Sequence, residues 1–193
     1  MQFGYEPPKW TFIFIGVCVA AFLIQNLTDY WIYLAFIPAY AFIMPWMFLS
    51  SIFLHADLSH LFFNMFALFF FGIYLERMVG RRVFAALFLV SGILGNVGHM
   101  LTVPNPYIPA VGASGAIYGI IGSLAILTPF LMVFVYGLLP VPMIVAALLW
   151  ALLDLFGLFN PSGIAHGAHL LGMLAGVTYG LYLRMSVRRR IRY

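Results

Sequence analysis

Charged residues are scarce in this chain. Asp, Glu, Lys and Arg make up 7% of its 193 residues, whereas soluble globular domains carry roughly 25%. So few charges cannot cover a water-facing surface, which excludes an ordinary soluble domain. Cysteine is almost absent as well. The single Cys18 excludes an intrachain disulfide and implies nothing about the redox compartment.

Long apolar runs take the place of charge, because 65% of the residues are hydrophobic. A membrane-spanning helix needs about 20 mostly apolar residues. We therefore expect an all-α polytopic membrane protein whose single domain covers residues 1–193. The six predicted spans lie at about 10–25, 58–78, 83–101, 114–127, 142–156 and 165–185. Residues 29–57 are apolar but broken by Pro38 and Pro45, which predicts a large interfacial loop with short helical pieces.

The positions of the basic residues favour this number of spans. The nine Lys and Arg residues are Lys9, Arg77, Arg81, Arg82, Arg184, Arg188, Arg189, Arg190 and Arg192. With six spans, all of them fall on one side of the membrane. The positive-inside rule then predicts that both termini are cytoplasmic. The basic tail at about 186–193 is expected to contact anionic lipid and not nucleic acid.

Polar residues inside the predicted spans gather near the opposite, external side. His60 and Asn64 share a face of the second span, Ser114 begins the fourth, and His166 and His169 share a face of the sixth. Polar side chains within a membrane are costly and tend to be functional. Each also has a simpler interpretation, since small residues around a serine serve helix packing.

Other polar residues leave their roles open at this stage. Asp154, near the outer end of the fifth span, could cap the loop or contact water in the site. His166 could be a capping or interfacial residue, and the role of His55 in the outer loop is undetermined. Glu76 beside Arg77 is most simply a local ion pair.

Three segments resemble the rhomboid intramembrane serine proteases: HLFFN at 60–64, GASGAIYG at 112–119 and AHGAHLLGMLAG at 165–176. Their order, spacing and side of the membrane match that family over roughly residues 46–180. One departure is Trp46-Met47, where the family often has Trp-Arg. The hydrogen bonds that the arginine usually makes in the large loop must therefore be replaced or absent.

The resemblance implies a rhomboid-like bundle and a role for each matching residue. Ser114 is the expected nucleophile and His169 its general base, with Tyr118 stacked on the His169 ring. His60 and Asn64 are expected to help stabilise the oxyanion, and His166 to hold water or line the site. Close helix packing is expected at Gly112, Gly115, Gly119, Gly172 and Gly176.

The expected function is a serine endopeptidase that cleaves in or near transmembrane segments of single-pass proteins. No carboxylate stands out as a partner for His169, so a Ser114–His169 dyad with an acyl-enzyme intermediate is predicted, without cofactor or metal. The expected partners are transmembrane substrates and lipid, in a minimal prokaryotic form whose site faces outward. Two alternatives stay open: an inactive rhomboid-like membrane-protein binder, and a histidine-based metal transporter.

Overall fold

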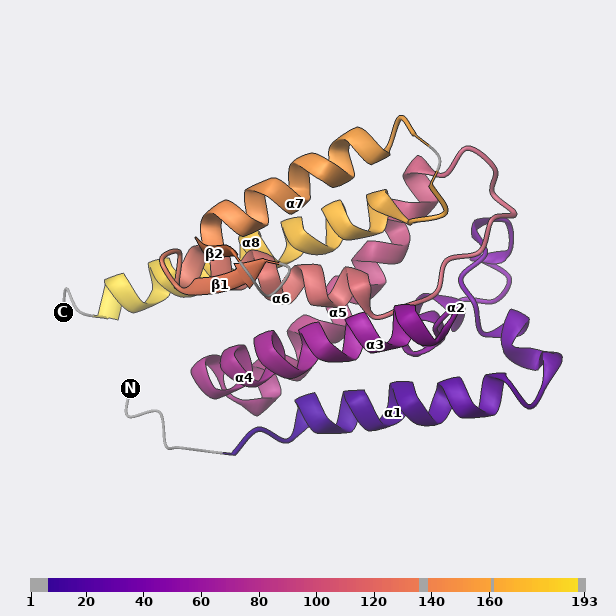
Figure 1. Ribbon diagram of the computed structural model, residues 1–193, viewed down its shortest axis with the longest axis horizontal. Coiled ribbons are helices and arrows are strands. Elements are labelled where there is room, and N and C mark those ends of the chain that lie inside the picture. Colours follow the sequence, from indigo (N-terminus) through magenta and orange to yellow (C-terminus); the bar gives the residue numbers. More distant parts are fainter. Residues whose placement is uncertain (1–6, 136–138, 161, 191–193) are drawn as a thin grey trace.

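The computed structural model describes residues 7–135, 139–160 and 162–190. Most of this chain is helical. The long helical segments are α1 (Trp10–Gln25), the continuous rod α3–η4–α4 (Leu58–Ala67, Leu68–Gly72 and Ile73–Val79), α5 (Arg81–Thr102), α6 (Ser114–Leu127), α7 (Met143–Gly157) and α8 (His166–Arg190). They lie side by side, and the chain alternates in direction from one to the next (Figure 1). The predicted bounds hold for α1 and α6, and differ by one to five residues elsewhere.

The large loop after α1 contains short helices, as its prolines predicted. These are η1 (Asp29–Tyr33), η2 (Pro38–Tyr40), α2 (Met47–Ser50) and η3 (Ser51–Phe53). The Trp46 indole N–H donates to the carbonyl of Tyr33 at 2.9 Å. Met47 is buried at 1% exposure in a small apolar cluster with Phe36. Apolar packing and the Trp46 bond help to hold this loop. The Asn96 amide on α5 also donates to the carbonyl of Phe48 and the hydroxyl of Ser51, each at 2.8 Å.

Helices α6 and α8 form the tightest contact, and glycines make it possible. A Cβ atom at Gly172 or Gly176 would collide with the backbone of Gly115 or Gly119 on α6. The Ser123 hydroxyl adds a buried hydrogen bond of 2.9 Å to the carbonyl of Gly176. The backbones approach this closely because neither surface carries a side chain at these positions.

Gly112 has a different role from the helix packing that the sequence predicted. It lies in the loop before α6 with a φ of +126°, a backbone conformation that favours glycine. A Cβ atom there would lie 2.9 Å from Nε2 of His60. Gly112 therefore allows this loop to pass against the His60 ring.

Glu76 binds the start of α1. The sequence alone suggests only a local ion pair with Arg77. Its carboxylate accepts hydrogen bonds from the backbone N–H groups of Lys9, Trp10 and Thr11, and from the Thr11 hydroxyl, at 2.8–2.9 Å. Glu76 is buried. A carboxylate at a helix N-terminus satisfies N–H groups that have no acceptor within the helix. This bond set ties α4 to α1.

A two-stranded antiparallel hairpin connects α6 to α7, and the sequence analysis did not predict it. Strands β1 (Met132–Val135) and β2 (Leu139–Pro142) pair with Val133 opposite Val141. The hairpin lies toward the end of the molecule that carries the two chain termini (Figure 1).

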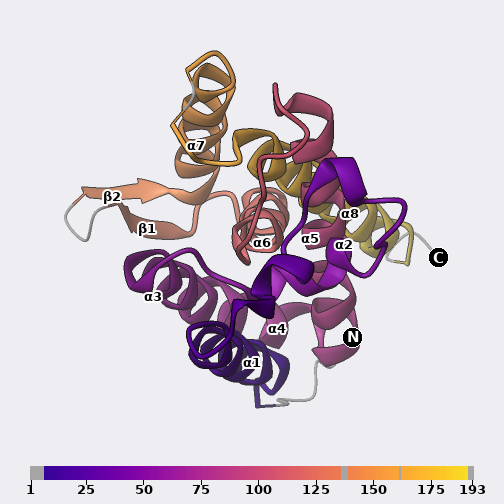
Figure 2. The same ribbon diagram turned by 90° about the vertical axis from the view of Figure 1, so that its right-hand side faces the viewer.

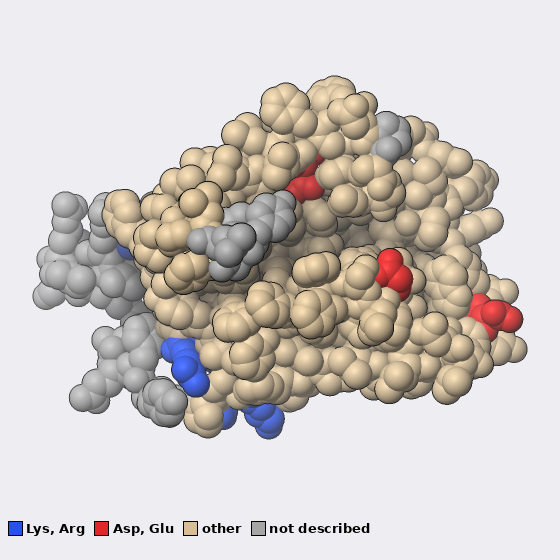
Figure 3. Space-filling model, viewed as in Figure 1, with Lys and Arg blue, Asp and Glu red and all other residues tan. Residues whose placement is uncertain are grey.

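Two of the described helices are long and apolar enough to cross a membrane by length and composition. They cover Leu58–Val79 and Arg81–Thr102, with 22 residues each, while α1, α6 and α7 are shorter apolar helices. Helix length alone thus does not establish six spans. The described Lys and Arg side chains visible on this face gather at one end, and a broad surface without charge separates them from the acidic side chains visible on the same face (Figure 3). The buried Glu76 lies at the basic end. Within the predicted basic tail, residues 191–193 and the side chains of residues 187–190 lie outside the part of the chain that the structure describes.

Candidate active site

A cavity of about 810 Å³ opens among the starts of α3, α6 and α8, at the end of the molecule away from the termini. Figure 2 views the molecule from this end. The cavity is lined by all five polar residues that the sequence analysis selected from three separate segments: His60, Asn64, Ser114, His166 and His169. His55 lines it too. The alternation of helix direction therefore brings these residues to one cavity.

Ser114 and His169 are joined by a direct hydrogen bond. The Ser114 hydroxyl lies 2.9 Å from Nε2 of His169. Ser114 is the first residue of α6, and His169 belongs to the first turn of α8. The two helices can deliver these side chains to one point because Gly172, three residues after His169, packs against the backbone of Gly115.

The imidazole of His169 is held on two further sides. The Tyr118 ring stacks on it with ring centroids 4.2 Å apart and an interplanar angle of 11°. Nδ1 of His169 lies 2.9 Å from Oδ1 of Asp154 on α7. An imidazole whose Nδ1 donates to a carboxylate has its Nε2 free to accept a proton. The arrangement suits a general base facing a hydroxyl.

The expectation that no carboxylate accompanies His169 is wrong. Asp154 is buried at 4% exposure. Its Oδ1 also lies 2.7 Å from Nδ1 of His166, whose Nε2 is 2.7 Å from the Ser162 hydroxyl. The signal was present in the sequence as a lone acid within an apolar helix, a costly arrangement that needs partners. Spacing alone could not pair it with histidines 12 and 15 residues away.

Asp57 fixes the start of α3 and so places His60. Its side chain accepts from the His60 N–H at 2.8 Å and from the Ser59 hydroxyl at 2.6 Å. These hydrogen bonds, that from Ser59 first, lower the pKa of the Asp57 carboxyl. The Ala56 N–H lies 3.4 Å from Nδ1 of His60. This contact makes Nδ1 the acceptor and leaves the proton on Nε2, the ring atom beside Gly112.

Asn64 lies one turn after His60 and is buried. Its Nδ2 donates to the carbonyl of His60 at 2.8 Å, and its Oδ1 has no hydrogen-bond partner within the described chain. One N–H of the amide therefore stays available toward the cavity, since an Asn side chain has two such donors.

Asp154, His166 and His169 are also the candidate for a metal site. One ligand atom from each lies within 4.8 Å of the others. These atoms are already joined by the hydrogen bonds that run from the two Nδ1 atoms to Asp154. A metal ion would have to displace both protons, so the hydrogen-bonded arrangement accounts for the cluster without one.

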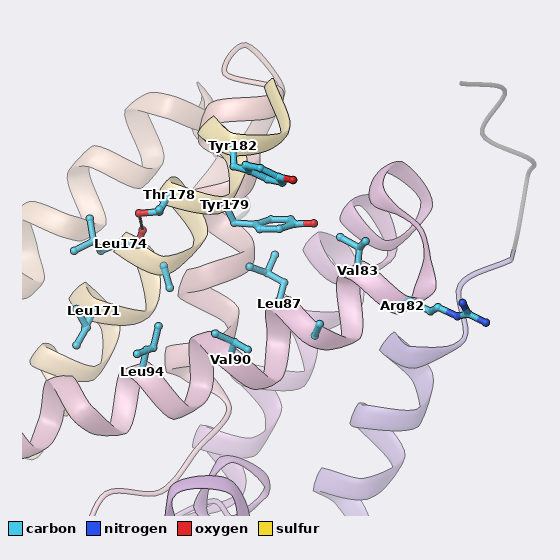
Figure 4. Close-up of a pocket in the computed structure, with 12 residues that line it drawn as sticks. Arg82, Val83, Leu87, Val90, Leu94, Leu171, Leu174, Thr178, Tyr179 and Tyr182 are labelled. Atoms are coloured by element: carbon cyan, nitrogen blue, oxygen red, sulfur yellow. Dashed lines mark hydrogen bonds between the residues drawn. The ribbon is translucent and has the colours of Figure 1, made fainter. Parts of the chain in front are cut away.

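A second cavity, of about 790 Å³, lies between α5 and α8 and shares no residue with the first. Leu87 and Val90 of α5 face Tyr179 of α8 across it, and the Arg82 side chain points away from the tyrosines (Figure 4). Among the described residues, its lining includes no histidine, cysteine, serine or carboxylate, and its one threonine hydroxyl, that of Thr178, donates to the carbonyl of Leu174 with no base beside it. We therefore assign the chemistry to the first cavity.

The fold and the site together define the class: a helical membrane protein whose cavity holds a hydrogen-bonded serine and histidine. Comparison with known proteins agrees, because the family model described as the Rhomboid domain matches residues 43–186. The chain belongs to the rhomboid family of integral membrane proteins.

Relatives within this family are mostly named as proteases. The rhomboid-family protein YdcA of Bacillus subtilis is 39% identical over 145 residues, which cover 75% of this chain and 70% of YdcA. The rhomboid protease GlpG of Klebsiella pneumoniae is 25% identical over 195 residues, covering 94% of this chain and 65% of GlpG. A relative named inactive, RHOMBOID-like protein 8 of Arabidopsis thaliana, is 39% identical over 79 residues, or 41% of this chain and 22% of that protein. Membership alone therefore does not decide between a protease and an inactive member.

Proposed function

We propose that the protein is an intramembrane serine endopeptidase that cleaves transmembrane proteins. The observation that carries this proposal is the 2.9 Å contact between the Ser114 hydroxyl and Nε2 of His169. A serine hydroxyl is a weak nucleophile unless an adjacent base removes its proton. An inactive binding protein has no need for a serine and a histidine in this geometry.

In the first half of the reaction, Oγ of Ser114 attacks the carbonyl carbon of the scissile bond while its proton moves to Nε2 of His169. The carbonyl electron pair moves to oxygen and forms an oxyanion. When the intermediate collapses, the C–N bond breaks and His169 gives the proton to the leaving amine. In the second half, water repeats these steps on the acyl-enzyme and releases Ser114.

The oxyanion would be stabilised by donors that meet at the start of α6. The backbone N–H of Ser114 belongs to the first turn of that helix, where N–H groups lack acceptors within the helix and the dipole favours negative charge. His60 carries its proton on Nε2, and the Asn64 amide retains a free N–H. Removing one such donor typically costs about 10²–10³ in rate.

The membrane topology that fits this chemistry has six spans, with both termini on the cytoplasmic side. The six long helical segments alternate in direction, and the described basic side chains lie at the end where α1 begins. The polar cavity then opens at the external side. Hydrolysis requires water, and this position gives water access while the substrate segment arrives from lipid.

Cleavage by the purified protein in liposomes, with a single-pass substrate, tests this function. We expect the wild type to cleave, and Ser114→Ala and His169→Ala to lose cleavage by at least about 10³-fold. Ser186→Ala is the matched control, because it removes a serine hydroxyl that bonds only within α8, 17 residues after His169 and outside the cavity lining. Binding of the substrate without cleavage by the wild type would favour the inactive binder.

A further inference from the structure

Asp154 contacts both histidines at the start of α8, and a catalytic pair of serine and histidine alone would need no such carboxylate. Its Oδ1 atom faces two imidazole nitrogens at once, Nδ1 of His169 and Nδ1 of His166, at 2.9 and 2.7 Å. We propose that Asp154 is a positioning residue for His169: its carboxylate fixes the reactive tautomer of the ring and stabilises the charge that the ring gains during the reaction. This inference rests on the proposed function and adds a third member to the serine–histidine pair.

The tautomer follows from the partners of each ring. An ionised carboxylate only accepts hydrogen bonds, so both histidines must carry their proton on Nδ1. Nε2 of His169 is then an acceptor, and the Ser114 hydroxyl must donate to it. The opposite tautomer would place an N–H against the hydroxyl and leave Ser114 without a base. Asp154 thus excludes the unreactive form of His169.

Two chains of hydrogen bonds, called the first and the second arm, end on Oδ1 of Asp154. One runs from Ser114 through His169 to Asp154, and the other from Ser162 through His166 to Asp154. Ser162 is exposed, whereas Ser114 is half-buried in the cavity. The second arm therefore fixes the direction of the carboxylate from the solvent side, and the first arm is the one that faces a substrate. His166 accordingly supports the carboxylate, and it also lines the cavity, one of the two roles that the sequence suggested.

Because Asp154 is buried, its negative charge can stabilise the imidazolium form of His169. The carboxylate is almost completely shielded, and its Oδ2 atom has no hydrogen-bond partner within the described chain. Tyr118, which stacks on His169, also interacts electrostatically with this carboxylate. A buried negative charge attracts a neighbouring imidazolium more strongly than an exposed one would, because the surroundings screen it less. The positive charge that forms on His169 in the transition state thus has a fixed partner.

The tautomer can be measured directly on the wild-type protein. Nitrogen NMR of the histidine-labelled protein in detergent should show His169 protonated on Nδ1, with Nε2 unprotonated. Replacing Asp154 with Asn, which has nearly the same shape, should redistribute the proton between the two nitrogens. A wild-type His169 protonated on Nε2 would overturn the proposal even if no variant of Asp154 folds.

Kinetics of variants separate a positioning role from a structural one. We expect Asp154→Asn to lower both kcat and the rate at which a fluorophosphonate labels Ser114 by about 10²- to 10⁴-fold, with KM within about threefold of the wild type. Asp29→Asn, the same change at an exposed site in the large loop, should keep wild-type rates. His166→Ala, which removes only the second arm, should cost less than about tenfold.

Two kinetic outcomes would contradict the proposal. One is an Asp154→Asn variant that cleaves within threefold of the wild type. The other is a His166→Ala variant that reproduces the whole loss, since Asp154 would then act by anchoring the loop. A wild-type protein that neither cleaves nor labels would instead refute the proposed function, and the NMR result would still report whether Asp154 fixes the ring.

Discussion

The Tyr118 ring lies parallel to the imidazole of His169, with centroids 4.2 Å apart. Contacts of this kind contribute about 0.5–1.5 kcal/mol beyond the area that they bury. Tyr118→Phe keeps the ring and should retain activity within about twofold. Tyr118→Leu removes it and should lower kcat about 2- to 10-fold, because His169 then leaves the productive orientation part of the time. Equal kcat values for the Leu variant and the wild type would show that the stack does not orient the base.

Glu76 should matter for stability and not for chemistry. Its carboxylate accepts four hydrogen bonds from the first turn of α1 and lies outside the candidate site. Glu76→Gln replaces one acceptor oxygen with an N–H donor that faces other donors. We expect a loss of about 2–4 kcal/mol in the free energy of unfolding, since a bond to a charged group contributes about 1.5–3 kcal/mol. The rate per folded molecule should not change.

Asp29→Asn, measured in the same unfolding assay, is the control for loss of a surface carboxylate. If Glu76→Gln unfolds at the wild-type midpoint, the anchoring of α1 through Glu76 is not energetically important.

The glycine contact between α6 and α8 should tolerate no side chain. A Cβ atom at Gly176 would collide with the Gly119 carbonyl, which belongs to backbone and cannot move aside. Gly176→Val should destabilise the protein by at least about 3 kcal/mol, since overpacking costs 1–3 kcal/mol even where side chains can adjust. It should also separate Ser114 from His169 and reduce cleavage by the molecules that remain folded.

Gly16 of α1 offers a control for the loss of a helical glycine, because a Cβ atom there would meet nothing within 4 Å. Gly16→Ala should leave activity unchanged and stabilise the helix by about 0.5–1 kcal/mol. A Gly176→Val variant as stable as Gly16→Ala would contradict the packing described for α6 and α8.

His55 should make the protein sensitive to acid. Burial, and then the nearby His60, lower the pKa of His55 from 6.5 to about 4. The unfolded chain therefore binds this proton at a higher pH than the folded chain does. The stability contributed by the neutral ring is complete above pH 6.5 and is lost as the pH falls toward 4, by about 3 kcal/mol in total.

Thermal unfolding in detergent at pH 7 and pH 4 measures this loss. The midpoint of the wild type should fall with acid, and that of His55→Gln should fall by less, because glutamine takes up no proton. The difference between the two proteins isolates His55 from other titrating groups. Parallel pH profiles would rule out His55 as the source.

Much of the helical scaffold could be predicted from apolar run length and from the prolines that break the large loop. Ser114 and His169 could be singled out because each is a polar residue in an apolar segment. The contact of Asp154 with both histidines could not be predicted, because it depends on how α7 is rotated against α8. The bonds from Glu76 to the start of α1 could not be predicted either, because the bonded residues are 65–67 positions apart and the bonds depend on how α4 packs against α1. The hairpin escaped prediction because β2 contains Pro140 and Pro142, which are uncommon within strands.

The most direct measurement of the central claim is the site at which a fluorophosphonate probe modifies the protein. Such probes react with an activated serine hydroxyl, and peptide mass spectrometry locates the adduct. We predict a single adduct on Ser114 in the wild type, strongly slowed by His169→Ala and absent in Ser114→Ala. An adduct on another serine, or equal labelling of Ser114 in the His169→Ala variant, would contradict the claim that His169 activates Ser114.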